Sequence, residues 1–124
     1  MRLFLDTDLP ELKQWMDDRG LETKQKPSTV GLIEPGVAAG FLYITDSNLA
    51  LLDLFITNPK VPFDERDRAI YKIGESLEDL AREMGFECLI WFTKNGNMVM
   101  RGINKGFKAE IFTVLRKDIT DGPK

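Results

Sequence analysis

The 124-residue sequence contains no histidine. Imidazole is the side chain that most often exchanges protons near neutral pH, and it is also the commonest zinc ligand. Its absence excludes histidine general bases, serine–histidine and cysteine–histidine nucleophile pairs, and most zinc sites. We expect no metal site, and any proton transfer has to rely on a carboxylate or on water.

Cysteine and long apolar runs are also scarce. The single cysteine, Cys88, cannot form a disulfide within the chain, which favours a reducing compartment and a cytoplasmic location. No stretch reaches the ~18 apolar residues of a membrane span, and the opening Met-Arg-Leu-Phe-Leu-Asp does not resemble a signal peptide. We therefore expect no contact with a membrane.

An excess of charge of one sign is missing as well. Acidic residues outnumber basic ones by 20 to 17, which argues against general nucleic-acid binding. A local basic patch stays open as an alternative in the C-terminal third, although scattered solvated side chains are the simpler explanation. The basic residues there are Lys94, Arg101, Lys105, Lys108, Arg116 and Lys117.

The length and the 43% of hydrophobic residues are typical of one globular domain, predicted over residues 1–119 with a frayed tail at 120–124. A strand is predicted at residues 2–6, then a helix that Asp8 caps with Glu11 in capping-box spacing and that Gly20 ends. After a polar loop at 21–28, turn residues separate three strands of a meander. These strands are predicted at 29–33, 37–45 and 49–57.

The second half continues with a helix that begins near Asp64, carries an apolar stripe and ends before Gly85. An apolar central strand at 88–93, in which Cys88 would be an inert core thiol, follows it. A short helix at 98–105 and a last strand at 109–116 complete the chain. The predicted fold is a mixed α/β sheet of order β-α-β-β-β-α-β-α-β, with an antiparallel meander joined to a parallel βαβ crossover.

Four short segments lie at or near the ends of these predicted helices and strands. They are Asp-Leu-Pro-Glu-Leu at 8–12, Ile-Thr-Asn-Pro at 56–59, Leu-Ala-Arg-Glu-Met-Gly-Phe at 80–86, and Asn95 followed by Lys-Gly-Phe at 105–107. In this order and spacing they resemble the GNAT superfamily of N-acetyltransferases over nearly the whole chain. The resemblance implies transfer of an acetyl group from acetyl-CoA to an amine on a small molecule or a protein.

The same resemblance implies a cofactor site. In this family the pantetheine arm of acetyl-CoA pairs with the fourth strand, which here places it beside the backbone of Phe55, Ile56 and Thr57. The phosphates would face the segment that contains Arg66, Arg68, Ala69, Ile70 and Tyr71. Asn95 would bind the cofactor or fix a loop, and capping of the short helix is its alternative role.

Two departures from the family pattern bear on activity. The positions of its phosphate-loop motif fall on Glu65, Arg68 and Ile70, so no glycine lets the backbone approach the phosphates. Arg66 and Arg68 would hold phosphate through their guanidinium groups, or else they are solvated helix residues. Gly74, one turn further on, does not restore the pattern and is interpreted as permitting close packing.

The second departure concerns proton transfer. Gly102 occupies the position at which many family members place a tyrosine that protonates the leaving thiolate. Asp53, the one charge inside the third meander strand, is the candidate general base for the amine. Its alternative is a residue that points to solvent or pairs with Lys108 or Arg116.

These departures leave a second function open, namely a catalytically inactive GNAT-like domain that acts through protein contacts. Reduced domains of this kind also resemble ones from bacteriophage genomes, including virion components. Pairing of two copies through the edge of the final strand would give a homodimer.

Overall fold

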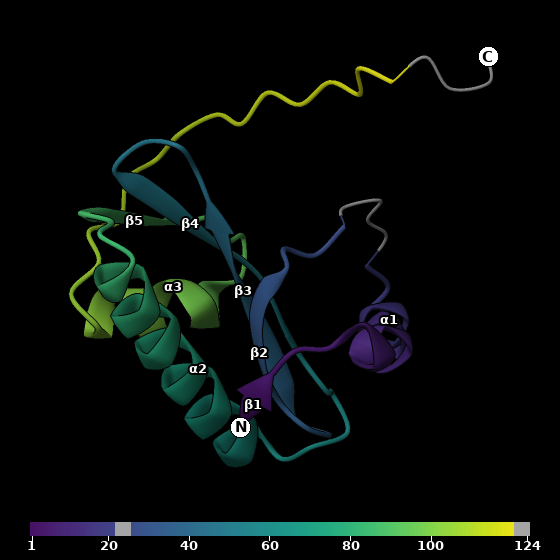
Figure 1. The fold of residues 1–124 in the computed structure, drawn as a ribbon. Helices are drawn as coiled ribbons and strands as arrows, with labels where there is room; N and C mark the ends of the chain where they lie inside the picture. Colours follow the sequence, from purple (N-terminus) through teal and green to yellow (C-terminus); the bar gives the residue numbers. More distant parts are fainter. Residues whose placement is uncertain (22–25, 121–124) are drawn as a thin grey trace. The chain divides into compact units, whose positions relative to one another are not determined.

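The computed structural model describes residues 1–21 and 26–120 (Figure 1). It divides into two compact units, Met1–Lys94 and Asn95–Lys124, and each is described by itself. The described part of the first unit holds strands β1 (Arg2–Leu3), β2 (Val30–Glu34), β3 (Ala38–Ile44), β4 (Leu49–Thr57) and β5 (Cys88–Trp91). Its helices are the 3-10 turn η1 (Asp6–Asp8), α1 (Leu9–Asp18) and α2 (Phe63–Glu83). The second unit holds α3 (Gly96–Asn104).

The five strands form one sheet in the order β1-β2-β3-β4-β5. Neighbouring strands are antiparallel except β4 and β5, which are parallel and joined by α2. The mixed α/β class, the antiparallel meander and the parallel crossover are therefore confirmed. The single domain at 1–119 stays a prediction, and residues 22–25 of the predicted loop and 121–124 of the predicted tail lie outside the described residues.

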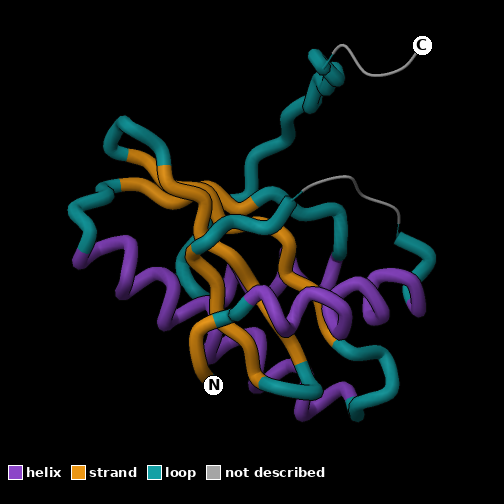
Figure 2. Tube along the Cα trace, turned by 45° about the vertical axis from the view of Figure 1, so that its right-hand side comes forward, coloured by secondary structure: helices purple, strands orange, loops and turns teal. Residues whose placement is uncertain are grey.

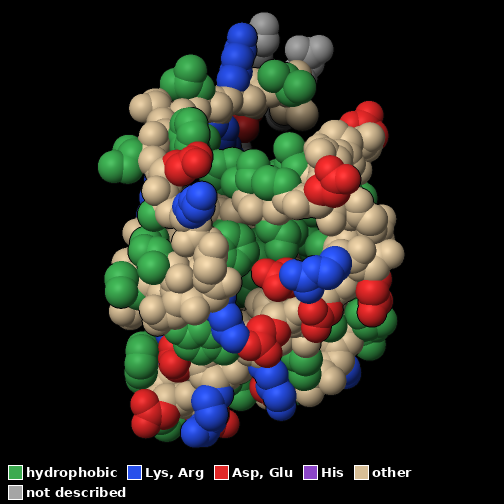
Figure 3. Space-filling model, turned by 90° about the vertical axis from the view of Figure 1, so that its left-hand side faces the viewer, with side chains coloured by type: hydrophobic (Ala, Val, Ile, Leu, Met, Phe, Trp, Pro, Cys, Tyr) green, Lys and Arg blue, Asp and Glu red, His purple; other side chains and the backbone are tan. Residues whose placement is uncertain are grey.

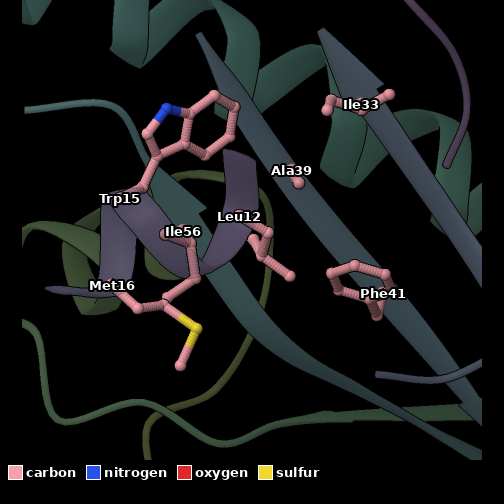
Figure 4. Packing of buried hydrophobic residues seen from close by; sticks show 7 residues of the cluster. All are labelled: Leu12, Trp15, Met16, Ile33, Ala39, Phe41 and Ile56. Atoms are coloured by element: carbon pink, nitrogen blue, oxygen red, sulfur yellow. The ribbon is translucent and has the colours of Figure 1, made fainter. Parts of the chain in front are cut away.

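The two long helices cover opposite faces of this sheet (Figures 1 and 2). On one face, α1 packs Leu12, Trp15 and Met16 against strand residues, as Figure 4 shows. The strand residues of this cluster are Ile33, Ala39, Phe41 and Ile56. Trp15 is 3% exposed, so its side chain belongs to the core. The burial of these large apolar side chains is the main force that holds α1 on the sheet.

The other face is covered by α2, whose apolar stripe is confirmed. Ile70, Ile73 and Leu77 recur at helical spacing and are buried. Gly20 and Gly85, just after α1 and α2, have φ of +66° and +90°, the left-handed conformation that ends helices. Helix α2 begins at Phe63, close to the predicted start, but Pro62 occupies the N-cap position, so the expectation that Asp64 caps this helix is wrong.

The predicted capping box at the start of α1 is also wrong. The Asp8 carboxylate makes no cap bond to α1. It instead accepts hydrogen bonds from both terminal nitrogens of Arg2, at 2.7 and 2.8 Å, and from the backbone N–H of Leu5 at 2.8 Å. Glu11 accepts a bond from the backbone N–H of Gly36 at 3.0 Å. Both acidic side chains therefore join distant segments instead of capping the helix, because a better donor lies nearby.

Strand β5 differs from its prediction as a central strand. It is the last strand in the sheet order, and its residues alternate between exposed and half-buried. Cys88 is exposed, so the interpretation as a core thiol is wrong. Apolar composition predicts that both faces of a strand are covered, but it does not tell whether the strand lies in the middle or at the end of the sheet.

The predicted last strand at 109–116 does not form in the described part of the chain. Residues 107–119 contain neither helix nor strand, and Figure 1 draws them as a coil. The sequence there has strand-forming residues, but a strand is stable only when its backbone groups pair with a neighbour. Within the described part of the second unit only α3 is regular, so that unit offers no strand neighbour.

Candidate functional site

The candidate site lies on β4, and a bulge gives it its shape. Leu54 has φ of +56°, a conformation that non-glycine residues seldom adopt. Pairing with β3 is regular up to Asp53 opposite Phe41, and it resumes with Ile56 opposite Ala39. The extra residue in β4 bends the strand at this point, as β-bulges do.

Gly40 accommodates the bulge on the neighbouring strand. A Cβ at Gly40 would lie 2.6 Å from the Phe55 ring and 3.0 Å from Ile73, so the ring occupies the space that a side chain would need. The Phe55 ring also meets Trp91 of β5, with centroids 4.9 Å apart. Phe55, predicted to face the cofactor, therefore turns its side chain toward α2 and leaves only its backbone for a ligand.

Strand β4 continues beyond the end of its neighbour β5. The parallel pairing covers Leu49–Leu52 opposite Cys88–Trp91, and β4 then runs five residues further to Thr57. The N–H of Asn58 donates to Val37 on the β3 side, so the backbone groups of Thr57 point to the opposite edge. By alternation the backbone groups of Phe55 point to that edge too, where the described residues provide no further strand.

Asp53 lies at the junction of the paired and the extended part of β4. Its carboxylate accepts a hydrogen bond from the backbone N–H of Leu54 at 2.7 Å, which helps to hold the bulge. The side chain is half-buried and lies on the α1 face of the sheet, because Asp53 pairs with Phe41. This position beside the open edge suits a general base, and that role stays a prediction.

An arginine that the sequence did not reveal meets the end of β4. Arg19 follows α1, and its Nε donates to the backbone oxygen of Thr57 at 2.9 Å while a terminal nitrogen donates to the Thr57 hydroxyl. Burial lowers the pKa of Arg19, and the nearby positive charge of Arg66 lowers it further. Arg66 is therefore near enough to Arg19 for the two positive charges to repel each other.

Arg66 lies in the first turns of α2. Its Nε is buried and has no hydrogen-bond partner among the described residues, and its guanidinium lies over the Phe63 ring, 5.7 Å from the centroid. A buried N–H without a partner is unfavourable by about 1–3 kcal/mol. An anion bound beside Arg66 would remove this penalty.

The other predicted phosphate-binding residues divide between the core and the surface. Ala69 and Ile70 are buried on the inner side of α2, whereas Arg68 is exposed and Tyr71 half-buried. Their amides belong to a regular helix, in which N–H groups past the first turn are already bonded. Among these predicted residues only the arginine side chains could therefore reach a phosphate, and Arg66 is the one with a buried N–H to satisfy.

Asn95 caps α3 within the second unit. Its side-chain oxygen accepts hydrogen bonds from the backbone N–H groups of Asn97 and Met98, at 2.9 and 3.2 Å. This confirms the capping role, and a contact with a cofactor stays a prediction. Gly102 lies inside α3, and Gly106 with φ of +91° follows the end of the helix as predicted.

Charged side chains of the described residues do not gather into a patch of one sign on the face in view. Basic and acidic side chains are interspersed on the face that Figure 3 shows. Arg101, counted among the basic residues, is only 7% exposed and donates to the sulfur of Met98 at 3.2 Å.

Among the described residues, no group of three or more acidic or cysteine side chains is placed to hold a metal ion. None of the described helices has the length and apolarity needed to span a membrane.

The sequence predicted neither the bulge in β4 nor the contact of Arg19 with Thr57. The run from Asp53 to Phe55 contains no glycine or proline that marks a bulge, and the signal lies on another strand, at Gly40. Arg19 is 38 residues from Thr57. An arginine at the end of a helix is ordinarily explained by the helix dipole alone, so only the fold reveals its contact.

Comparison with known proteins identifies the fold. No protein-family model and no curated protein sequence matches the chain. The fold is similar to a crystal structure described as a probable acetyltransferase, with a TM-score of 0.67 and 13% identity over 98% of this chain and 99% of that chain. It is also similar to an acetyltransferase of Trypanosoma brucei, with a TM-score of 0.61 and 14% identity over 95% and 97% of the two chains. The chain thus has an acetyltransferase-like fold.

Proposed function

We propose that this protein is a GNAT-type N-acetyltransferase that transfers the acetyl group of acetyl-CoA to an amine. The observation that carries the proposal is the extended end of β4, where a bulge and the lack of a further strand among the described residues leave the backbone edge at Phe55 open. An open strand edge can bind an extended, amide-containing chain by added-strand hydrogen bonds. The pantetheine arm of acetyl-CoA has this chemistry.

The two arginines fit the other end of the same ligand. Arg19 binds the end of β4 and is near enough to Arg66 to feel its charge, and Arg66 has a buried N–H without a partner in the described chain. Guanidinium groups bind phosphate strongly and with defined geometry. The N-terminal end of α2 adds a positive partial charge beside them. Arg66 would hold the diphosphate directly, and Arg19 would add its charge while it fixes Thr57.

The residues present also fit the acyl-transfer chemistry. When bound, acetyl-CoA supplies the acetyl group as an activated thioester. The backbone N–H groups on the open edge of β4 would stabilise the negative charge that develops on a carbonyl oxygen. The Asp53 carboxylate would take a proton from the amine, because only a neutral amine is nucleophilic. With Gly102 in place of a tyrosine, a water molecule would protonate the leaving thiolate.

Isothermal titration calorimetry with acetyl-CoA tests the site, with Arg66→Gln and Arg68→Gln as a matched pair of variants. Both remove one positive charge from the first turns of α2, but only Arg66 has a buried N–H. We expect Arg66→Gln to weaken binding about 10- to 100-fold, the range of one charged hydrogen bond, and Arg68→Gln to change it little. No saturable binding by the unmodified protein at millimolar acetyl-CoA overturns the proposal.

A second candidate function is the inactive GNAT-like domain that acts through protein contacts. Exposed acidic residues in the first turn of α2, Asp64 and Glu65, favour it because they repel phosphate. The glycines of the phosphate loop are also absent. Release of free thiol from acetyl-CoA, followed with a panel of small amines and amine-bearing peptides, separates the two functions. Saturable binding without turnover of any acceptor would favour the inactive domain.

A further inference from the structure

The loop between β4 and α2 contains no glycine, yet hydrogen bonds that converge on Asn58 define its shape. The Asn58 side chain donates from Nδ2 to the backbone oxygen of Gly36 and accepts from the backbone N–H of Lys60, both at 3.0 Å. Its own backbone N–H donates to the Val37 oxygen at 2.8 Å, and its backbone oxygen accepts from the Val61 N–H at 3.2 Å. All four polar groups of this half-buried residue therefore contact the loop or the turn between β2 and β3.

Gly36 links Asn58 to α1. It lies in the turn between β2 and β3 with φ of +78°, a left-handed conformation that suits glycine. Its backbone oxygen accepts the bond from Asn58, and its backbone N–H donates to the Glu11 carboxylate at 3.0 Å. A path of hydrogen bonds therefore runs from α1 through this turn to the loop that precedes α2.

The same loop is bonded at both of its ends. At the β4 end, Arg19 donates to the backbone oxygen and to the hydroxyl of Thr57, the residue before Asn58. At the α2 end, the backbone oxygen of Pro62 accepts from the Arg66 N–H at 3.1 Å. Arg66 therefore follows a loop whose start is fixed to α1 at two points, through Arg19 and through the β2–β3 turn.

We propose that Asn58 is a positioning residue of the acetyl-CoA site, an inference that rests on the proposed function. Its hydrogen bonds keep Arg66 and the N-terminal end of α2 in place for the diphosphate. Glycine loops bind phosphate by letting the backbone approach it, whereas this loop fixes a guanidinium group in advance. A loop that is ordered before binding loses less conformational entropy when the ligand binds. Loss of the Asn58 side chain should therefore weaken only ligands that carry the diphosphate.

Two ligands with the same thioester arm test this role. S-acetylpantetheine has the thioester and the pantetheine arm of acetyl-CoA but lacks the diphosphate and the nucleotide. In calorimetry, Asn58→Ala should raise the Kd of acetyl-CoA about 3- to 10-fold, the range of one lost hydrogen bond, and leave the Kd of S-acetylpantetheine unchanged. An equal loss for both ligands would show a general effect on folding and would overturn the positioning role, as would no loss for either.

Asn48→Ala is the matched control at the other end of β4. Asn48 precedes the strand, and its Nδ2 donates to the Glu87 carboxylate at 3.1 Å. This variant removes the same kind of side chain and one hydrogen bond of the same kind, but at the opposite end of the strand. We expect the ratio of the two Kd values to stay unchanged, and a shift as large as that of Asn58→Ala would contradict the proposal.

Variants of Glu11 test the path to α1 without touching the loop. Glu11→Ala removes the acceptor of the Gly36 N–H, and Glu11→Gln keeps an acceptor oxygen while it removes the same charge. We expect Glu11→Ala to shift the ratio in the same direction as Asn58→Ala, by about 2- to 3-fold, and Glu11→Gln to restore it. Equal ratios for the two Glu11 variants would contradict the path through Gly36.

Hydrogen exchange without any ligand separates a failure of this role from a failure of acetyl-CoA binding. Asn58→Ala should speed exchange at the Lys60 and Val61 amides at least about 5-fold and leave the amides of α1 unchanged. Unchanged exchange at both loop amides would overturn the role of Asn58 even if acetyl-CoA binds. Faster exchange in a protein that does not bind acetyl-CoA would overturn the proposed function, and with it the role of Asn58 toward the diphosphate, whereas its effect on the loop would stand.

Discussion

The β1–β3 half of the sheet and the β4–β5 half differ in how completely their groups are paired. In the first half, Arg2 and Asp8 form a two-bond ion pair, Glu11 binds the turn at Gly36, and α1 covers the strands. In the second half β4 continues past its neighbour, Arg66 has a buried N–H without a described partner, and β5 is partly exposed. The first half has its polar groups paired, and the second retains unsatisfied groups at which a bound ligand would gain hydrogen bonds.

This contrast predicts that substitutions in the open half impair activity, whereas those in the paired half impair folding. Asp53→Asn should have the largest effect on turnover, about 100- to 10,000-fold, the range for loss of a general base. The amide oxygen of asparagine can still accept the bond from the Leu54 N–H, so we expect the bulge to persist. Acetyl-transfer kinetics and urea unfolding measure the two effects separately.

Asp53→Ala serves as the control, because it removes both the base and the bond to Leu54. It should reduce turnover and also lower the free energy of unfolding. If Asp53→Asn retains full turnover with an unchanged pH–rate profile, Asp53 has only a structural role at the bulge.

The paired half should show the opposite behaviour. The Phe41 ring is fully buried, meets Phe4 edge-on at 4.9 Å, and fills the space above Gly31. We expect Phe41→Ala to lower the free energy of unfolding by about 3–5 kcal/mol, as removal of a buried aromatic ring does. Chemical denaturation measures this loss. The fraction that remains folded should bind acetyl-CoA with unchanged affinity, and a large loss of affinity would show that the two halves are coupled.

The sequence predicted the helices and strands better than it predicted the difference between the two halves of the sheet. Apolar periodicity located α2, and the strands of the meander end within one residue of their predicted bounds. Gly20, Gly85 and Gly106 ended the helices because each needs a positive φ that other residues adopt at an energetic penalty. These features depend on local chemistry, which is written in neighbouring residues.

The site depends on contacts between distant residues, and these were harder to predict. The Asp8 carboxylate has the spacing of a cap, yet Arg2 is a stronger donor than a backbone amide. The meeting of Arg19 with Thr57 has no local signal. The apolar pattern at 109–116 predicted a strand that the described residues do not form, because a strand also needs a paired neighbour, which composition does not specify.

Gly40 lies where the two halves meet, and its substitution sharpens the comparison. A methyl group there would overlap the Phe55 ring, so Gly40→Ala should lower the free energy of unfolding by about 1–3 kcal/mol, as overpacking does. The displaced ring should also disturb the bulge and weaken acetyl-CoA binding. Thermal unfolding and calorimetry measure both effects, and the double variant with Phe55→Leu should recover part of the stability.

Gly74→Ala is the matched control for this substitution. Nothing lies within 4 Å of a Cβ at Gly74, so the interpretation that this glycine permits close packing is wrong. Alanine is the better helix former, and we expect stabilisation by about 0.5–1 kcal/mol. Destabilisation by both alanine variants would show that the Phe55 contact is not the cause at Gly40.

The last comparison concerns the ion pair of the paired half, whose contribution to stability depends on pH. Hydrogen bonds from the Arg2 guanidinium, together with the one from the Leu5 amide, lower the pKa of Asp8 to about 2 against the opposing effect of burial. Its value in the unfolded chain is near 3.8. A carboxyl group whose pKa is lower in the folded state stabilises the fold above its unfolded pKa. That stabilisation is lost as the pH falls from about 4 to about 2.

Asp8→Asn removes this titrating group, so its urea midpoint should lie below that of the unmodified protein at pH 7. Between pH 4 and pH 2 the two midpoints should converge, because the unmodified protein loses the charged form of Asp8 over that interval. Asp6→Asn, an exposed neighbour in the same turn, controls for the loss of one negative charge and should leave the difference between pH 7 and pH 2 intact. Parallel curves for Asp8→Asn and the unmodified protein would show that the ion pair does not contribute to holding β1 against η1.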